Sequence, residues 1–217
     1  MKDFKIVWSA RSECGPNRKK NEDTIFPAIS GSSKPPFKAA VCDGLGGHVN
    51  GDVASKIAAD TLLKEITDLN QIITEANKNI LEYQDKNPSS LGMGTTMTAI
   101  SIDSDALMKI GHVGDSRCYV LSDRNLIKVT EDQNVPGYQN VLKQALGSNE
   151  KLNIQEVDFQ LQIGDVVFLC SDGLYNEVGE EYIKKKMQDG ISADTFVGEV
   201  LLLNPKDNVS AIVINVV

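Results

Sequence analysis

Cysteine and histidine are scarce in this sequence, and long apolar runs are missing. The 217 residues include four cysteines and two histidines. The cysteines form no C-x-x-C pair and lie mostly inside apolar stretches that read as strands; they are Cys14, Cys42, Cys118 and Cys170. This distribution predicts buried free thiols in the reducing environment of a cytoplasmic protein.

The sequence also shows no apolar segment of the kind that enters or crosses a membrane. No stretch approaches the roughly 18 apolar residues that a membrane-spanning helix needs. The N-terminus is charged at Lys2, Asp3 and Lys5 and leads into no apolar segment, so no signal peptide is expected. We expect a cytoplasmic protein with no membrane partner.

Positive charge is in the minority. Lys and Arg number 22 against 30 Asp and Glu, which gives a net charge of −8. Such a chain lacks the basic footprint with which proteins bind a nucleic-acid backbone, so no nucleic-acid partner is expected. The surplus carboxylates have two readings, a solvated acidic surface or a set of cation ligands, and their positions must decide between them.

Length and apolar spacing predict one α+β domain over residues 1–217. Helical spacing of apolar residues occurs at 53–66, at 72–81 before Asn87-Pro88, and at 193–201, whereas 31–36 reads as a surface loop. Because strands follow strands and helices are grouped, the pattern favours α+β layering. The predicted strands are 4–9, 23–29, 37–42, 95–102, 107–113, 116–121, 126–130, 154–159, 165–170 and 208–216.

Acidic residues recur where these predicted strands begin or end. They are Glu22-Asp23, Asp43, Asp115, Asp172 and Asp207. One such acid fits an ordinary turn, but several in one small domain converge if the strand ends share an edge. Two carboxylates about 4 Å apart repel by roughly 4 kcal/mol at an effective dielectric of about 20, so a cation must lie between them. A site built only from oxygen ligands predicts hard divalent ions, which in pairs promote hydrolysis of phosphoesters.

Other phosphate-binding or calcium-binding motifs are incomplete. Gly44-Leu-Gly-Gly-His-Val49 and Gly92-Met-Gly-Thr-Thr-Met97 both lack the last glycine of G-x-G-x-x-G. No P-loop and no EF-hand pattern occurs. One cysteine, Cys118, has an arginine six residues on, Arg124, but this cysteine lies inside the predicted strand 116–121 and not in a phosphate-binding loop. Nucleotide binding, calcium sensing and a cysteine-based phosphatase mechanism are therefore not expected.

An ordered set of short motifs gives the sequence a family resemblance. The set resembles the PPM/PP2C family of metal-dependent protein phosphatases, bacterial type, from residue 11 to the C-terminus. The resemblance implies a four-layer αββα sandwich of two antiparallel β-sheets flanked by helices, with metals in a cleft at one end. The motifs are Arg18-Lys-Lys-Asn-Glu-Asp23, Val41-Cys-Asp-Gly-Leu-Gly-Gly-His48, Gly94-Thr-Thr96, Val113-Gly-Asp-Ser-Arg117, Ala145-Leu-Gly147, Ser171-Asp-Gly-Leu174 and Asp207-Asn208.

The resemblance also implies a metal cofactor, two core Mg²⁺ or Mn²⁺ ions. Asp43 resembles the carboxylate that bridges both ions, and Gly44 would offer its backbone carbonyl to one of them. Asp172 and Asp207 would complete the coordination of the other ion.

Three further acids have peripheral roles in this family. Glu22 and Asp23 resemble the pair that reaches a metal mostly through its waters. Asp115 matches the residue that holds a third, looser ion together with Asp172.

The expected reaction is hydrolysis of phosphoserine or phosphothreonine in proteins, by in-line attack of a hydroxide that bridges the two ions. Arg18 lies four residues before Glu22, where the family places the arginine that binds the substrate phosphate, and Arg11 is a weaker candidate. A guanidinium suits this role because its planar fork meets two phosphate oxygens. We expect Thr95, Thr96, Ser116 and Arg117 to support the site without touching substrate.

Two departures from the family pattern affect the general acid and substrate selection. Leu45 stands where eukaryotic members often carry a histidine, and neither His48 nor His112 replaces it, so the general acid is unassigned. The segment 131–137 is shorter than the flap usual in bacterial members, and substrate selection should differ accordingly.

Two alternatives from other classes stay open. One is a non-catalytic relative that binds phosphoproteins, which loss of metal ligands would reveal, and no ligand is missing. The other is a phosphatase of a small phosphometabolite, which needs a closed polar pocket. For the protein phosphatase, we expect a monomer that opposes a Ser/Thr kinase.

Overall fold

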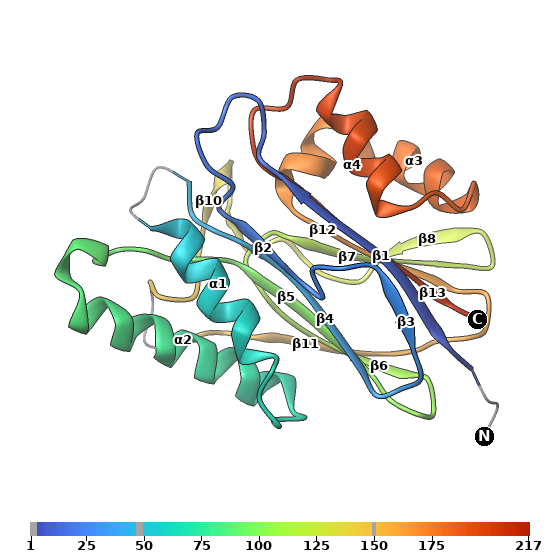
Figure 1. Cartoon of the computed structure of the whole chain (residues 1–217), viewed down its shortest axis with the longest axis horizontal. Helices are drawn as coiled ribbons and strands as arrows, with labels where there is room; N and C mark the ends of the chain where they lie inside the picture. The colour runs from blue at the N-terminus through green and yellow to red at the C-terminus, as the bar shows by residue number, and fades with distance from the viewer. Residues whose placement is uncertain (1–3, 47–49, 149–150) are drawn as a thin grey trace.

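Two antiparallel β-sheets stacked face to face form the centre of the computed structural model, which describes residues 4–46, 50–148 and 151–217 (Figure 1). The first sheet has the order β3 (Gly31–Ser33), β1 (Ile6–Glu13), β13 (Val209–Val216), β12 (Val166–Cys170), β7 (Arg117–Ser122), β8 (Asn125–Lys128). The second has the order β11 (Gln155–Gln160), β6 (Leu107–Val113), β5 (Met97–Ile102), β4 (Phe37–Asp43), β2 (Asp23–Phe26).

Helices cover the outer face of each sheet (Figure 1). The first pair, α1 (Gly51–Thr61) and α2 (Leu69–Lys86), packs on the second sheet, and α3 (Asp172–Gln188) and α4 (Ala193–Leu201) pack on the first. Three clusters of buried apolar side chains fill the spaces between these layers. This arrangement confirms the predicted αββα sandwich.

Local sequence explains why α2 begins and ends where it does. The Asp68 side chain accepts a hydrogen bond from the Gln71 backbone N–H and so caps the first turn. Ile72, Ile73, Ala76 and Ile80 are buried at three- and four-residue steps, as the spacing predicts. The helix ends at Lys86, directly before Asn87-Pro88, because a residue before proline disfavours the helical conformation.

The helix α3 was not predicted from the sequence. Its buried residues Leu174 and Tyr175 are separated from Ile183 and Met187 by a break in the helical backbone at Gly179, where φ is 70° and ψ is 168°. A left-handed glycine of this kind interrupts the apolar spacing, so no single helical period runs through the segment.

Two smaller predictions were wrong. The segment 31–36 was expected to be a loop, but Gly31–Ser33 forms the short edge strand β3, which pairs with Ile6–Trp8 of β1. Cys14 was expected to be buried like the other cysteines and is exposed, because it lies beyond the end of β1. In the described part of the chain, no helix is both long and apolar enough to span a membrane.

The outer apolar layer above the first sheet depends on one aromatic stack. Phe168 is fully buried, its ring centroid lies 4.6 Å from that of Phe196, and the ring centroid of Tyr119 lies 6.4 Å from it. We expect Phe168→Ala to lower the free energy of unfolding by about 3–5 kcal/mol, because it removes a large buried ring and leaves a cavity. Urea denaturation measures this change, with Leu202→Ala, 85% exposed, as the control. Equal unfolding midpoints for the two variants would contradict the packing assigned to Phe168.

Candidate active site

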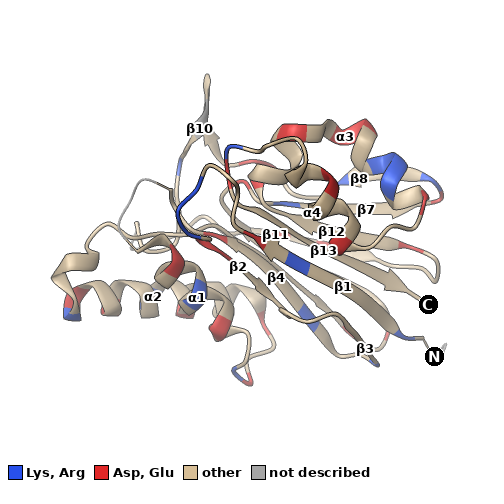
Figure 2. Ribbon diagram, turned by 45° about the horizontal axis from the view of Figure 1, so that its top comes forward, with Lys and Arg blue, Asp and Glu red and all other residues tan. Residues whose placement is uncertain are grey.

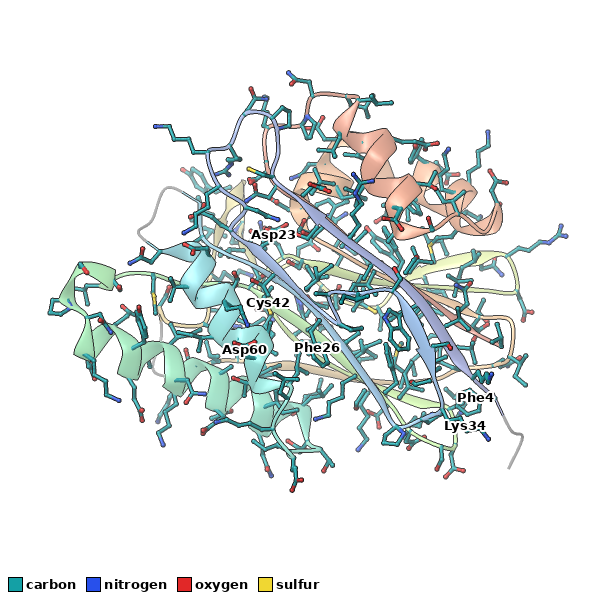
Figure 3. All side chains as sticks on the ribbon, in the orientation of Figure 1. Phe4, Asp23, Phe26, Lys34, Cys42 and Asp60 are labelled. Carbon is teal, nitrogen blue, oxygen red and sulfur yellow. The ribbon has the colours of Figure 1, made fainter. Side chains whose placement is uncertain are left out.

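The acidic residues singled out in the sequence meet at one end of the sandwich. Asp23 begins β2 and Asp43 ends β4, and the two residues are direct cross-strand partners. Asp172 follows β12 and Asp207 precedes β13, two strands that are also neighbours. Asp115 lies in the turn from β6 to β7. Figure 3 places Asp23 at this end of the strands, far from Phe4 and Lys34, which lie at the other.

Crowding changes the titration of these carboxyl groups. Burial, together with the charges of Asp172 and Asp207, raises the pKa of Asp23 to about 6. Burial and the charges of Asp115 and Asp207 raise the pKa of Asp172 to about 7. The pKa of Asp43 lies well above its ordinary value, because of burial and then because of Asp23 and Asp172. These groups stay fully ionised at neutral pH only where positive charge compensates them.

The donor set fits a hard divalent cation. The described acids offer only oxygen ligands, and Oδ1 of Asp23 is buried with no hydrogen-bond partner among the described residues, whereas its Oδ2 accepts a hydrogen bond of 2.6 Å from Ser210. As the side chains stand in the described ranges, no three His, Cys, Asp or Glu residues converge as ligands of one ion.

Arg18 occupies the edge of this cluster. Its Nη2 lies 2.5 Å from Oδ2 of Asp207, and its Nη1 lies 3.8 Å from Oε2 of Glu22. Burial opposes the positive charge, but the hydrogen bond and the charge of Asp207 raise the pKa of Arg18. Figure 2 shows the basic stretch of the β1–β2 loop beside acidic segments at this end of the sandwich. Gly46 lies against the guanidinium, since a Cβ there would be 2.6 Å from Nη1.

The backbone of Asp43 is held by the threonines of the Gly-Thr-Thr motif. Its N–H donates to Oγ1 of Thr96 at 3.0 Å, and its carbonyl accepts hydrogen bonds from the Thr96 N–H and from Oγ1 of Thr95. Ser116 joins the network through a 2.8 Å contact with Thr96. These contacts agree with the supporting role expected of all three residues.

Gly44 leaves no room for a side chain. A Cβ at this position would lie 2.4 Å from the carbonyl oxygen of Gly51 and 2.6 Å from that of Glu22. The Gly44 N–H donates to the Glu22 carbonyl at 3.2 Å, so the β4 end and the β1–β2 loop touch here. The absence of a side chain at Gly44 is therefore a packing requirement.

Asp115 is fixed from two sides. Only 8% of its surface is exposed, Oδ2 accepts a 3.0 Å hydrogen bond from the Asn134 amide, and the Asp115 carbonyl accepts one from the Tyr175 hydroxyl. Burial raises the pKa of Asp115, although the Asn134 hydrogen bond opposes this effect. The guanidinium of Arg117 lies 3.5 Å from the centroid of the Tyr175 ring and pairs with Asp132.

Among the described residues, the one histidine is His112, and it is no obvious general acid. His112 is fully buried beneath the site, as expected, and contacts Oγ1 of Thr98 and the Glu131 carbonyl. Burial lowers the pKa of His112 to about 4. Gly47 and His48 of the glycine-rich motif lie outside the described residues.

The cysteines near the acids are chemically quiet. Burial raises the pKa of both Cys42 and Cys170, so these thiols stay protonated. Arg11, the weaker candidate for phosphate binding, is engaged elsewhere, since it contacts Glu13 and the Asp194 carbonyl at the start of α4.

Two asparagines of the site received no role from the sequence. Asn134 contacts Asp115 as described above, and no motif marks it. Asn208 is 2% exposed; in the amide orientation that satisfies both of its polar atoms, it donates to the Lys20 carbonyl and accepts from the Glu22 N–H. The sequence marked Asn208 only by its place directly after Asp207 in a family motif. Through these two hydrogen bonds Asn208 holds the loop that carries Arg18.

Comparison with known proteins agrees with this geometry. The family model described as protein phosphatase 2C matches residues 16–197. The serine/threonine phosphatase stp of Listeria monocytogenes serotype 4b is 31% identical, over 94% of this chain and 93% of that protein. The serine/threonine protein phosphatase PstP of Mycobacterium tuberculosis is 29% identical over 98% of this chain, which spans 45% of that protein.

Solved structures show the same fold. The catalytic domain of PstP in complex with two manganese ions superposes with a TM-score of 0.86 at 29% identity, over 99% of both chains. The prediction of a protein serine/threonine phosphatase is confirmed. The motifs, the sandwich and the acidic cluster at its end thus agree with the matching family model, and the chain belongs to the protein phosphatase 2C family.

Proposed function

We propose that this chain hydrolyses phosphoserine and phosphothreonine in proteins, with a pair of Mg²⁺ or Mn²⁺ ions at the acidic end of the sandwich. The observation that carries this proposal is that Asp23 and Asp43 are cross-strand partners at the same end of the sandwich as Asp172 and Asp207. Burial and mutual charge there raise the pKa values of Asp23, Asp43 and Asp172. The manganese-bound PstP domain, which shares the fold, supports the choice of ion.

The proposed ligands of the core ions are Asp43, the Gly44 carbonyl, Asp172 and Asp207. Glu22 and Asp23 would reach an ion through water, and Asp115 would hold a third, outer ion together with Asp172. When bound, the ion pair supplies the nucleophile of the expected mechanism, a water whose pKa it lowers, and neutralises charge that develops on the phosphoryl group.

The residues of the chain would orient the reactants. Thr95 and Thr96 hold the backbone of Asp43 with hydrogen bonds, so the position from which its side chain extends is fixed. Arg18 would bind two oxygens of the phosphate with its guanidinium fork. Because Arg18 contacts Asp207 at 2.5 Å, the phosphate dianion and the Asp207 carboxylate are alternative partners of one guanidinium.

The two rival functions receive less support. A hollow of about 670 Å³ is lined by residues that include Leu121, Arg124 and Ile163, which lie at the end of the sandwich away from the acids. A small phosphometabolite would need such a hollow at the acids themselves. A non-catalytic relative is disfavoured because every proposed ligand position holds an oxygen donor.

The first prediction concerns metal dependence. We expect turnover of a phosphoserine or phosphothreonine peptide with Mn²⁺, reversible loss of turnover with a chelator, and no turnover by Asp43→Ala. Asp85→Ala, an exposed acid on α2, is the matched control and should keep wild-type activity. A panel of phosphopeptides and small phosphometabolites, assayed with and without chelator, measures all of these. Turnover by demonstrably metal-free protein would rule out the proposed chemistry.

A second prediction concerns Arg18. We expect Arg18→Ala to keep core-ion binding but to lower kcat/KM for a phosphopeptide by about 10- to 100-fold, since a charge-assisted hydrogen bond contributes roughly 1.5–3 kcal/mol. Arg18→Lys should recover only part, because an ammonium lacks the planar fork. Arg11→Ala, which removes an arginine paired elsewhere, is the control. An Arg18→Ala enzyme with unchanged kcat/KM would remove the arginine from the mechanism.

A third prediction uses the contact between Arg18 and Gly46. A Cβ added at Gly46 would lie 2.6 Å from Nη1 and 2.8 Å from Nη2 of Arg18, so it displaces the guanidinium. We expect Gly46→Ala to raise KM for the phosphopeptide in the wild-type background but not in Arg18→Ala. A double-mutant cycle measures this coupling. Additive effects of the two substitutions would show that Gly46 acts independently of Arg18.

A further inference from the structure

The segment that replaces the longer family flap is a short hairpin fixed to the turn that carries Asp115. Its strands are β9 (Asn134–Val135) and β10 (Tyr138–Leu142), and Figure 2 shows β10 projecting from the sandwich. At the hairpin base, the Gln133 N–H donates to the Gly114 carbonyl at 2.9 Å, and the Gly114 N–H donates to Oε1 of Gln133 at 2.9 Å. The hairpin and the β6–β7 turn therefore form one hydrogen-bonded unit.

An ion pair between Arg117 and Asp132 also joins the hairpin to the β6–β7 turn. Nε and Nη2 of Arg117 donate to Asp132 at 2.9 Å and 2.6 Å, a bidentate pair directly before the hairpin. Arg117 also lies over the Tyr175 ring, and the Tyr175 hydroxyl donates to the Asp115 carbonyl. Bidentate charge-assisted pairs constrain orientation as well as distance. The backbone on both sides of the Asn134–Asp115 contact is thus fixed.

The Asn134 amide engages one oxygen of Asp115 only. Nδ2 donates to Oδ2 at 3.0 Å. Asp115 and Asp172 lie at the same end of two neighbouring strands, because Arg117 at the start of β7 is the cross-strand partner of Cys170 at the end of β12. Fixing Oδ2 sets the rotation of the Asp115 carboxylate and therefore the direction in which Oδ1 points.

We propose that Asn134 is a positioning residue that orients Asp115 toward the outer ion shared with Asp172. This inference rests on the proposed function, in which Asp115 holds that ion. Asp115 then contacts both the hairpin, through Asn134, and the outer ion. As a result, a residue that is not itself a metal ligand controls the affinity for the outer ion. Groups that orient a metal ligand in this way contribute about 10- to 100-fold in affinity elsewhere.

The test is a Mn²⁺ titration of the full chain, followed by calorimetry and by the electron paramagnetic resonance signal of free Mn²⁺. We expect Asn134→Ala to bind the two core ions as the wild type does and the outer ion about 10-fold more weakly. Asn134→Leu, which keeps the side-chain size but cannot donate, should behave in the same way. Tyr138→Ser, on the exposed part of the same hairpin, is the matched control and should bind all ions normally.

Activity gives a second readout that a general loss of structure would not reproduce. Turnover by Asn134→Ala should fall at low Mn²⁺ and return to the wild-type value at high Mn²⁺, whereas Asp115→Ala should not recover. Wild-type affinity for the outer ion in both Asn134 variants, with a loss in Asp115→Ala, would overturn the positioning role alone. Wild-type ion binding in Asp115→Ala as well would overturn it together with the outer-ion assignment, while the core-ion proposal would still stand on Asp43→Ala.

Discussion

Mutual repulsion among carboxylates is the constraint on which the rest of the site depends. Asp23 and Asp43 are direct cross-strand partners, and the charge of Asp172 acts on both. Like charges placed opposite each other destabilise a sheet, so this arrangement lowers the stability of the folded state unless positive charge is present. The sandwich supplies the rigidity that keeps these side chains together, with three apolar clusters behind them.

Short polar contacts offset part of the repulsion between these carboxylates. Ser210 donates to Asp23, Thr96 accepts from the Asp43 backbone, and Arg18 pairs with Asp207. Each contact joins an acid to a different segment of the chain, so the loops at this end are tied together by the groups that repel one another. Metal ions are thus expected to stiffen this end of the protein as well as to supply chemistry.

Sequence reasoning located the acids because each of them stands at a strand boundary, and strand boundaries are visible in apolar patterning. It also separated the helices α1, α2 and α4 from the strands for the same reason. It missed α3, because Gly179 breaks the spacing between Tyr175 and Ile183. It could not find the Asn134–Asp115 contact, since a two-residue strand carries no periodic signal and the partners are 19 residues apart. The pairing of Arg18 with Asp207 was equally hidden, because salt bridges between distant loops leave no local pattern.

The four thiols differ in burial, so the protein has one cysteine that reagents in solution can reach selectively. Cys42, Cys118 and Cys170 are buried, whereas Cys14 is exposed and its thiol contacts the Arg18 carbonyl at 3.5 Å. A thiol-reactive fluorophore would therefore attach at one position, on the loop that carries the proposed phosphate-binding arginine, without mutation of the other cysteines. The emission of such a label would follow the environment of this loop directly, in the native protein and in real time.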